Sequence, residues 1–121
     1  MKLNHLNLVV SDVVATSAFF RKYFQFEEME IKGNNVIAVL KGNDGFILVL
    51  MMAKEKGNPY PADFHFGFLL NNRDEVLTIF ERLKADGYIT KNAPSKIRNT
   101  FGFYLTIPGN VLMEVSCSLN A

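Results

Sequence analysis

Two similar stretches of sequence decide the fold: His5-Leu-Asn-Leu-Val-Val-Ser-Asp12 and His65-Phe-Gly-Phe-Leu-Leu-Asn-Asn72. Each begins with a histidine, continues as a short apolar run typical of a β-strand, and ends in side-chain oxygens that can cap a helix. The chain therefore repeats one unit with a period of about 60 residues. We expect the functional site to lie where the two copies face each other.

The first copy begins with alternating faces over residues 3–10, where His5, Asn7 and Val9 share one face. Ser11 and Asp12 offer N-cap oxygens to a helix over 13–24, whose apolar stripe can pack on the back of a sheet. Breaks rich in glycine and asparagine then separate three further strands. We expect these strands at about 26–31, 35–41 and 45–52.

The second copy repeats this order after a polar linker at about 53–62, in which two prolines bar a helix or central strand. A strand is expected over 65–70, followed by a helix that Gly87 ends. The apolar positions of this helix fall at i, i+3, i+4 and i+7: Val76, Ile79, Phe80 and Leu83. Further strands are expected at about 88–91, 100–106 and 111–117, with a loop through Pro94 and a turn at 108–110.

This order predicts an α+β fold of two βαβββ modules that form a curved mixed sheet around a cleft. We expect one domain over 1–121, with module 1 at about 1–52, the linker at about 53–62 and module 2 at about 63–121. Each module alone would leave the concave face of its sheet uncovered. Two modules must therefore meet, within one chain or between two.

The composition excludes several classes of protein. With 121 residues, 49% of them hydrophobic, the chain can form one compact domain. A net charge of +1 provides no electrostatic footprint for nucleic acid, and the apolar runs are too short to span a membrane. The N-terminus has no signal-peptide pattern, and Cys117 is the only cysteine. We expect a cytoplasmic protein in which Cys117 is a small buried residue.

The sequence resembles the vicinal oxygen chelate superfamily, which includes glyoxalase I, bleomycin-resistance proteins, fosfomycin-resistance thiol transferases and extradiol dioxygenases. The matching segments are 3–12, 18–26, 65–68 and 108–115. The likeness covers nearly the whole chain and is more specific for the fold than for the reaction. The closing turn departs from the family's usual Asp-Pro-Asp-Gly, since this chain has Ile-Pro-Gly-Asn at 107–110.

The resemblance implies a divalent metal with four possible ligand positions, which correspond here to His5, Val49, His65 and Glu114. The repeat supports this correspondence, because His5 matches His65 and Val49 matches Glu114. Valine cannot bind a metal, so two histidines and one glutamate remain. That set suits Fe, Mn, Zn or Ni with open positions for a small molecule carrying vicinal oxygens, which the metal would activate as a Lewis acid.

Strand parity places Glu114 opposite the apolar face of the last strand. A carboxylate between apolar neighbours is costly to bury unless something pairs with it, and a metal held by two imidazoles would do so. Alternatively, Glu114 pairs with Arg98 or a lysine, and His5 is an ordinary histidine at a strand end. Descent from a metal-binding ancestor that has lost its activity would also place both histidines where they are.

Other residues are candidates for the substrate pocket. Asn7 points with His5, and Val49 occupies the fourth ligand position. Tyr104 lies on a strand that faces the site in the family pattern, where it could act in catalysis by donating a hydrogen bond, or be an ordinary core-edge tyrosine. A loop carrying Arg98 and two lysines, Lys91 and Lys96, could receive an anionic substrate, although such loops are often simply solvated.

Three functional classes remain open. The first is a metal-dependent lyase, dioxygenase or thiol transferase acting on a small molecule. The second is a metal-free protein that sequesters a drug-like or apolar ligand, which the 11 phenylalanines would suit. The third is an inactive or regulatory relative. The resemblance also implies a homodimer, in which His5 of one chain could join His65 and Glu114 of the other.

Overall fold

The computed structural model describes residues 1–55, 57 and 60–120, and the chain divides into two compact units. Unit 1 comprises Met1–Pro61 together with Ile107–Val111, and unit 2 comprises Ala62–Thr106 together with Leu112–Ala121. Part of the expected linker, at Lys56, Asn58 and Pro59, lies outside the described residues. No helix among the described residues is long and apolar enough to cross a membrane.

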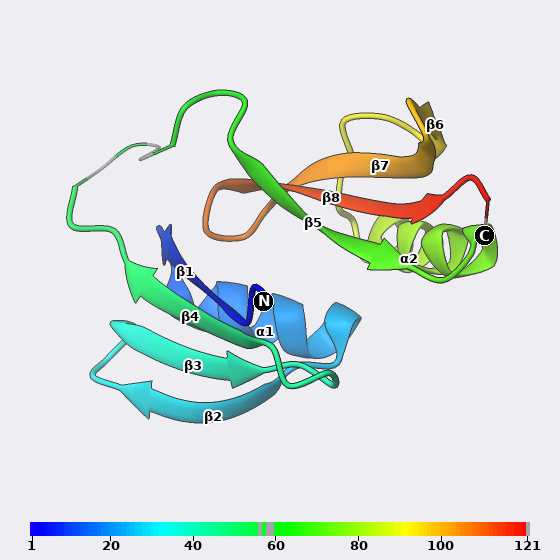
Figure 1. Ribbon diagram of the computed structural model, residues 1–121. Helices are drawn as coiled ribbons and strands as arrows, with labels where there is room; N and C mark the ends of the chain where they lie inside the picture. Colours follow the sequence, from blue (N-terminus) through cyan, green and yellow to red (C-terminus); the bar gives the residue numbers. More distant parts are fainter. Residues whose placement is uncertain (56, 58–59, 121) are drawn as a thin grey trace. The chain divides into compact units, whose positions relative to one another are not determined.

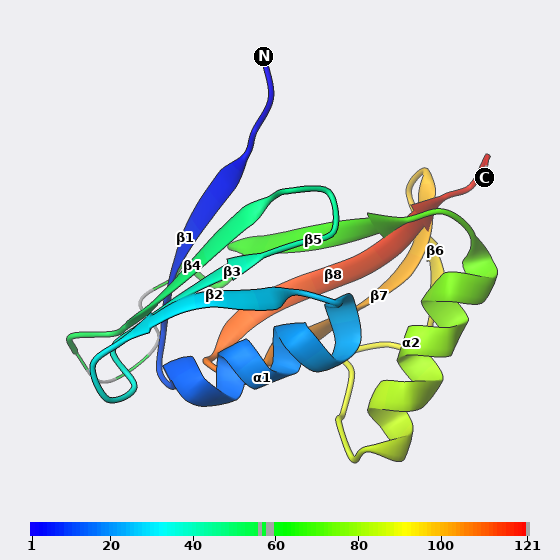
Figure 2. The same ribbon diagram turned by 90° about the horizontal axis from the view of Figure 1, so that it is seen from below.

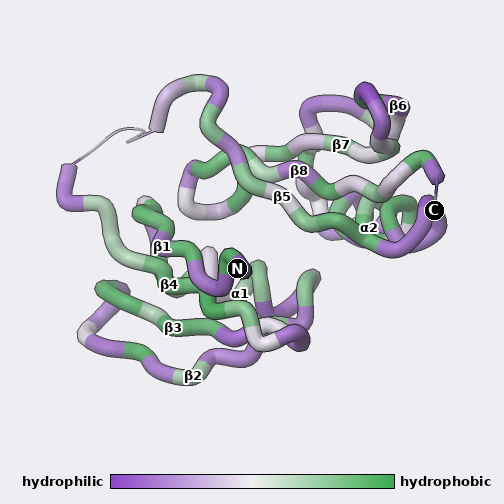
Figure 3. Tube along the Cα trace, viewed as in Figure 1, coloured by the Kyte–Doolittle hydropathy of each residue, from purple (hydrophilic) through white to green (hydrophobic). Residues whose placement is uncertain are grey.

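Unit 1 is a four-stranded sheet with one helix (Figure 1). Its strands follow the order β1-β4-β3-β2, with β1 parallel to β4 and the other neighbours antiparallel. The elements are β1 (His5–Val10), α1 (Val13–Phe24), β2 (Glu27–Lys32), β3 (Ile37–Lys41) and β4 (Ile47–Met52). Figure 3 shows β3 and β4 as mainly hydrophobic and β2 as mainly hydrophilic, which suits an edge strand.

Helix α1 begins and ends through local interactions and packs on the back of its sheet (Figure 2). The Asp12 carboxylate accepts a hydrogen bond from the Ala15 N–H at 3.0 Å, which confirms the predicted N-cap. Gln25 ends the helix in the left-handed conformation. Phe20 is fully buried, as are Leu8 and Leu50 of the sheet, so the alternation predicted for β1 is confirmed.

Unit 2 repeats this architecture with the strand order β5-β8-β7-β6. Its elements are β5 (His65–Leu70), α2 (Arg73–Ala85), β6 (Ser95–Ile97), β7 (Thr100–Ile107) and β8 (Val111–Ser118). Asn72 caps α2 by accepting a hydrogen bond from the Glu75 N–H, and Gly87 follows the helix with φ of +92°. Both ends of this helix were therefore predicted correctly.

The strand expected at 88–91 was wrong. Those residues form no strand, and the second strand of this module is β6, where a loop was expected. The reason is register: Ser95 pairs with Gly102 and Ile97 with Thr100, so a tight hairpin is formed by later residues. Lys91 and Asn92 instead contact β7 through a few individual hydrogen bonds.

The two units confirm an α+β fold built from two βαβββ modules. The apolar face predicted for β8 is also confirmed, since Met113 and Val115 are fully buried while Glu114 is half-buried on the opposite face. Cys117 is a free and fully buried cysteine, as expected.

Candidate functional site

Strand register establishes which positions of the two modules are equivalent. In unit 1, Asn7 of β1 lies opposite Val49 of β4. In unit 2, Gly67 of β5 lies opposite Glu114 of β8. Because Asn7 and Gly67 each follow the module's first histidine by two residues, Val49 and Glu114 occupy the same place in their sheets. The equivalence expected from the repeat is therefore confirmed by the strand pairing.

His65 and Glu114 lie together on one face of the unit 2 sheet. Nε2 of His65 is 3.5 Å from Oε1 of Glu114, and their side chains are 38% and 19% exposed. Nδ1 of His65 lies 3.0 Å from the backbone carbonyl of Asp63. A carbonyl oxygen can only accept, so this hydrogen bond places the proton on Nδ1. Nε2 is then the ring nitrogen that faces the Glu114 carboxylate.

Gly67 allows β5 and β8 to approach closely beside this pair. A Cβ atom at position 67 would lie 2.8 Å from the backbone oxygen of Glu114 and 3.1 Å from its Cβ. Any larger residue would therefore require the strands or the glutamate to shift. This role of Gly67 was not predicted from the sequence, although a glycine inside a strand is a recognised signal of close backbone approach.

Tyr104 of β7 completes a three-residue cluster with His65 and Glu114. Its ring centroid lies 5.4 Å from that of His65, with the planes at 80°, an edge-to-face contact. Burial raises the pKa of the Tyr104 hydroxyl, and the negative charge and hydrogen bonding of Glu114 raise it further, while the positive charge of Arg98 lowers it. The phenol is thus held in its protonated form, able to donate a hydrogen bond.

The corresponding face of unit 1 carries the other histidine. Nδ1 of His5 lies 2.7 Å from Oδ1 of Asn4, so the same ring nitrogen is engaged as in His65. His5 and Asn7 are exposed, and Val49 is half-buried. The Asn7 amide donates to the sulfur of Met51 at 3.2 Å. Both histidines therefore keep Nε2 as the candidate ligand atom.

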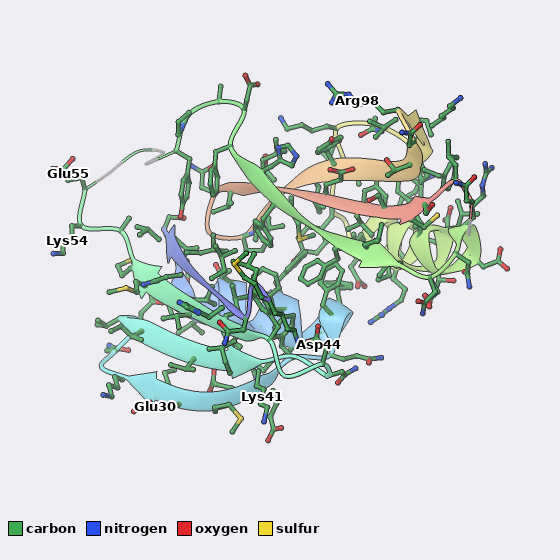
Figure 4. All side chains as sticks on the ribbon, in the orientation of Figure 1. Glu30, Lys41, Asp44, Lys54, Glu55 and Arg98 are labelled. Atoms are coloured by element: carbon green, nitrogen blue, oxygen red, sulfur yellow. The ribbon has the colours of Figure 1, made fainter. Side chains whose placement is uncertain are left out.

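Arg98 lies in the turn between β6 and β7 and adopts a left-handed backbone conformation with φ of +54° (Figure 4). Such a conformation costs an ordinary residue roughly 1–3 kcal/mol, and such outliers cluster at functional sites. Its charge acts on the Tyr104 hydroxyl. The side chains of Lys91 and Lys96 are exposed, and Lys91 contacts β7 through its backbone.

The predicted site residues thus fall into two sets. His65, Tyr104, Glu114 and Arg98 belong to unit 2, where the first three are in contact, whereas His5, Asn7 and Val49 belong to unit 1. Within the part of the chain that the structure describes, no three His, Cys, Asp or Glu side chains form a metal-binding group. Among the described residues, His65 is the basic side chain within 4 Å of the Glu114 carboxylate, and no ion pair of Glu114 with Arg98 or a lysine is found there.

The chain belongs to the Glyoxalase/Bleomycin resistance protein/Dioxygenase superfamily, whose family model matches residues 2–115. It is similar to the structure of a possible glyoxalase from Bacillus cereus, with 43% identity, a TM-score of 0.86, and coverage of 97% of this chain and 99% of that one. No curated protein matches the chain.

More distant structures share the fold. Lactoylglutathione lyase from Agrobacterium tumefaciens has 21% identity and a TM-score of 0.75, with 96% of this chain and 92% of that one covered. A glyoxylase/bleomycin resistance protein/dioxygenase domain from Frankia sp. EAN1pec has 15% identity and a TM-score of 0.80, with 98% of each chain covered.

Proposed function

We propose that this protein is a metal-dependent enzyme acting on a small molecule with two adjacent oxygens, and that His5, His65 and Glu114 bind one divalent ion. The observation that carries the proposal is the His65–Glu114 pair, with Nε2 and Oε1 only 3.5 Å apart. The backbone carbonyl of Asp63 holds Nδ1 of His65, the nitrogen that would not bind the metal. Metal-binding histidines are commonly oriented by such a hydrogen bond. His5 is included because it is equivalent to His65 by sequence and its Nδ1 is also engaged, by the side-chain oxygen of Asn4.

The side chains present fit such an ion. Two imidazoles and one carboxylate suit Fe, Mn, Zn or Ni, and a bound ion would supply Lewis-acid activation of the substrate oxygens. The Glu114 side chain is only 19% exposed, and a cationic partner would offset the cost of partly burying its carboxylate. Tyr104 would donate a hydrogen bond to the substrate from its protonated hydroxyl. Asn7, Val49 and Arg98 would line the pocket, with Arg98 attracting an anionic group.

The first test is elemental analysis of protein purified without chelator or polyhistidine tag. We expect about one equivalent of Fe, Mn, Zn or Ni per chain in the native protein, and loss of that metal in His65→Ala and Glu114→Gln. Glu30→Gln is a matched control, because Glu30 is an exposed carboxylate paired with Lys32 and should leave metal content unchanged. Circular dichroism would show that each variant is folded.

His5→Ala tests the third ligand separately. If this variant keeps full metal affinity while His65→Ala loses it, His5 is not a ligand and the site must be completed otherwise. If the native protein binds none of these ions even after reconstitution, the metal proposal is wrong as a whole. Light scattering would test the further expectation that the protein is a homodimer, and fractionation would test its cytoplasmic location.

A second candidate is a metal-free protein that sequesters an apolar ligand. Leu69 favours it, because this leucine is 71% exposed although strand alternation puts it on the same face as His65. Val49 adds a second apolar side chain at a position where the family can place a ligand. Binding of an apolar fluorescent probe that is unaffected by Glu114→Gln but weakened by Leu69→Ser would favour this function over the metal enzyme.

A further inference from the structure

A short segment before β6 lies along the edge of β7 at Tyr104. The Lys91 N–H donates to the Tyr104 carbonyl at 2.7 Å, and the Tyr104 N–H donates to Oδ1 of Asn92 at 3.0 Å. The pairing of β6 with β7 extends only from Thr100 to Gly102. Both backbone groups of Tyr104 on this edge are therefore satisfied by the segment rather than by a neighbouring strand.

Asn92 is suited to this task because its amide carries both an acceptor and donors, as a peptide group does. Its Nδ2 donates to the Ala93 carbonyl at 3.0 Å and, at 3.4 Å, to the carbonyl of Gly102 on β7. Thr90 donates through Oγ1 to the Asn92 carbonyl at 2.8 Å, which holds its backbone. The half-buried side chain thus replaces a missing strand partner at two positions of β7.

We propose that Asn92 is a positioning residue that sets the ring of Tyr104 beside His65 and Glu114. The direction of a strand side chain follows its backbone, so an edge residue whose backbone partners are lost moves its ring as well. Loss of the Asn92 side chain would leave the Tyr104 N–H without its acceptor. The inference rests on the proposed function only where it assigns the cluster of His65, Tyr104 and Glu114 a part in catalysis. The position of the Tyr104 ring can be measured without metal or substrate.

The test is two-dimensional NMR of the metal-free protein. With only two histidines in the chain, comparison with His65→Ala identifies the His65 ring protons. We expect cross-peaks between the His65 and Tyr104 rings in the native protein, and their loss or reduction by at least half in Asn92→Ala. Asn92→Asp keeps an acceptor for the Tyr104 N–H and should retain the cross-peaks.

The control is Asn43→Ala, which removes an asparagine whose Nδ2 donates to Oε1 of Gln25 in unit 1. It should leave the cross-peaks unchanged. Unaltered cross-peaks in folded Asn92→Ala would overturn the proposal and leave Asn92 a purely structural residue of the loop. Should Asn92→Ala fail to fold, Asn92→Asp decides: retained cross-peaks support the proposal, and their loss in a folded protein contradicts it.

Metal analysis separates this inference from the proposed function. Asn92→Ala should bind metal as the native protein does, because it leaves all three proposed ligands in place. If the native protein binds no metal, the proposed function fails while the NMR comparison still determines whether Asn92 positions Tyr104.

Discussion

Gly67 lies directly opposite Glu114 in the parallel pair of β5 and β8, with no room for a side chain between them. The Cβ of an alanine at position 67 would be 3.1 Å from the Cβ of Glu114. His65 is two residues away on the same face, so the side chain of Glu114 can reach its Nε2 across the space that the glycine leaves. The geometry of the candidate site therefore depends on a residue that carries no chemistry.

Gly67→Ala should destabilise the protein by roughly 1–3 kcal/mol, the usual cost of overpacking, despite the gain from reduced freedom of the unfolded chain. It should also weaken any metal binding at Glu114. Urea unfolding with metal titration would measure both effects. Gly102→Ala provides a comparison: its Cβ would meet backbone atoms of Val115 and Ser116, so a greater loss is expected. A Gly67→Ala protein as stable as the native one would refute the close approach.

Tyr60→Phe should destabilise unit 1 by roughly 1–3 kcal/mol, because it leaves part-buried backbone groups without partners. The Tyr60 hydroxyl accepts a hydrogen bond from the Val9 N–H at 2.7 Å and donates to the Val9 carbonyl at 2.9 Å. Val9 lies on β1, an edge strand of its sheet. Chemical denaturation followed by circular dichroism would measure the change. An unchanged unfolding free energy would show that water replaces the hydroxyl at no cost.

Stability should fall with increasing pH above about 10, where a tyrosine in the unfolded chain ionises. Burial raises the pKa of Tyr60, although its backbone hydrogen bond to Val9 partly offsets this, and burial raises that of Tyr104 as well. Above pH 10 the unfolded chain releases protons that the folded protein retains, so unfolding becomes more favourable. Denaturant titrations at several alkaline pH values should show a shallower decline in Tyr60→Phe. If the stability of Tyr60→Phe fell as steeply with pH as that of the native protein, Tyr60 would not contribute to the pH dependence.

Arg98→Gly should be more stable than Arg98→Ala by roughly 1 kcal/mol, because glycine adopts the left-handed conformation without the penalty that a Cβ imposes. Both variants remove the guanidinium, so their difference isolates the backbone from the charge. Thermal unfolding of the two proteins gives the comparison. Equal stability would mean that the turn changes conformation when the arginine is removed.

The sequence by itself determined the repeated order of elements, the bounds of most helices and strands to within about two residues, and the faces of β1 and β8. Local rules are sufficient for these features, since alternation, N-caps such as Asp12 and Asn72, and the glycine after α2 act over a few residues. The register equivalence of Val49 and Glu114 also followed, because in each module the last strand pairs in parallel with a first strand that begins with a histidine.

Only the tertiary structure decided which residues contact one another across strands. It placed the second strand of the second module at Ser95–Ile97 rather than 88–91, since pairing with β7 outweighs local propensity in so short a segment. It brought Tyr104 against His65, engaged Asn92 with the backbone of β7, and placed Gly67 where a Cβ would crowd Glu114. These contacts join residues that are 12 to 47 positions apart in the sequence. Their geometry depends on strand register and close approach, which no local sequence pattern specifies.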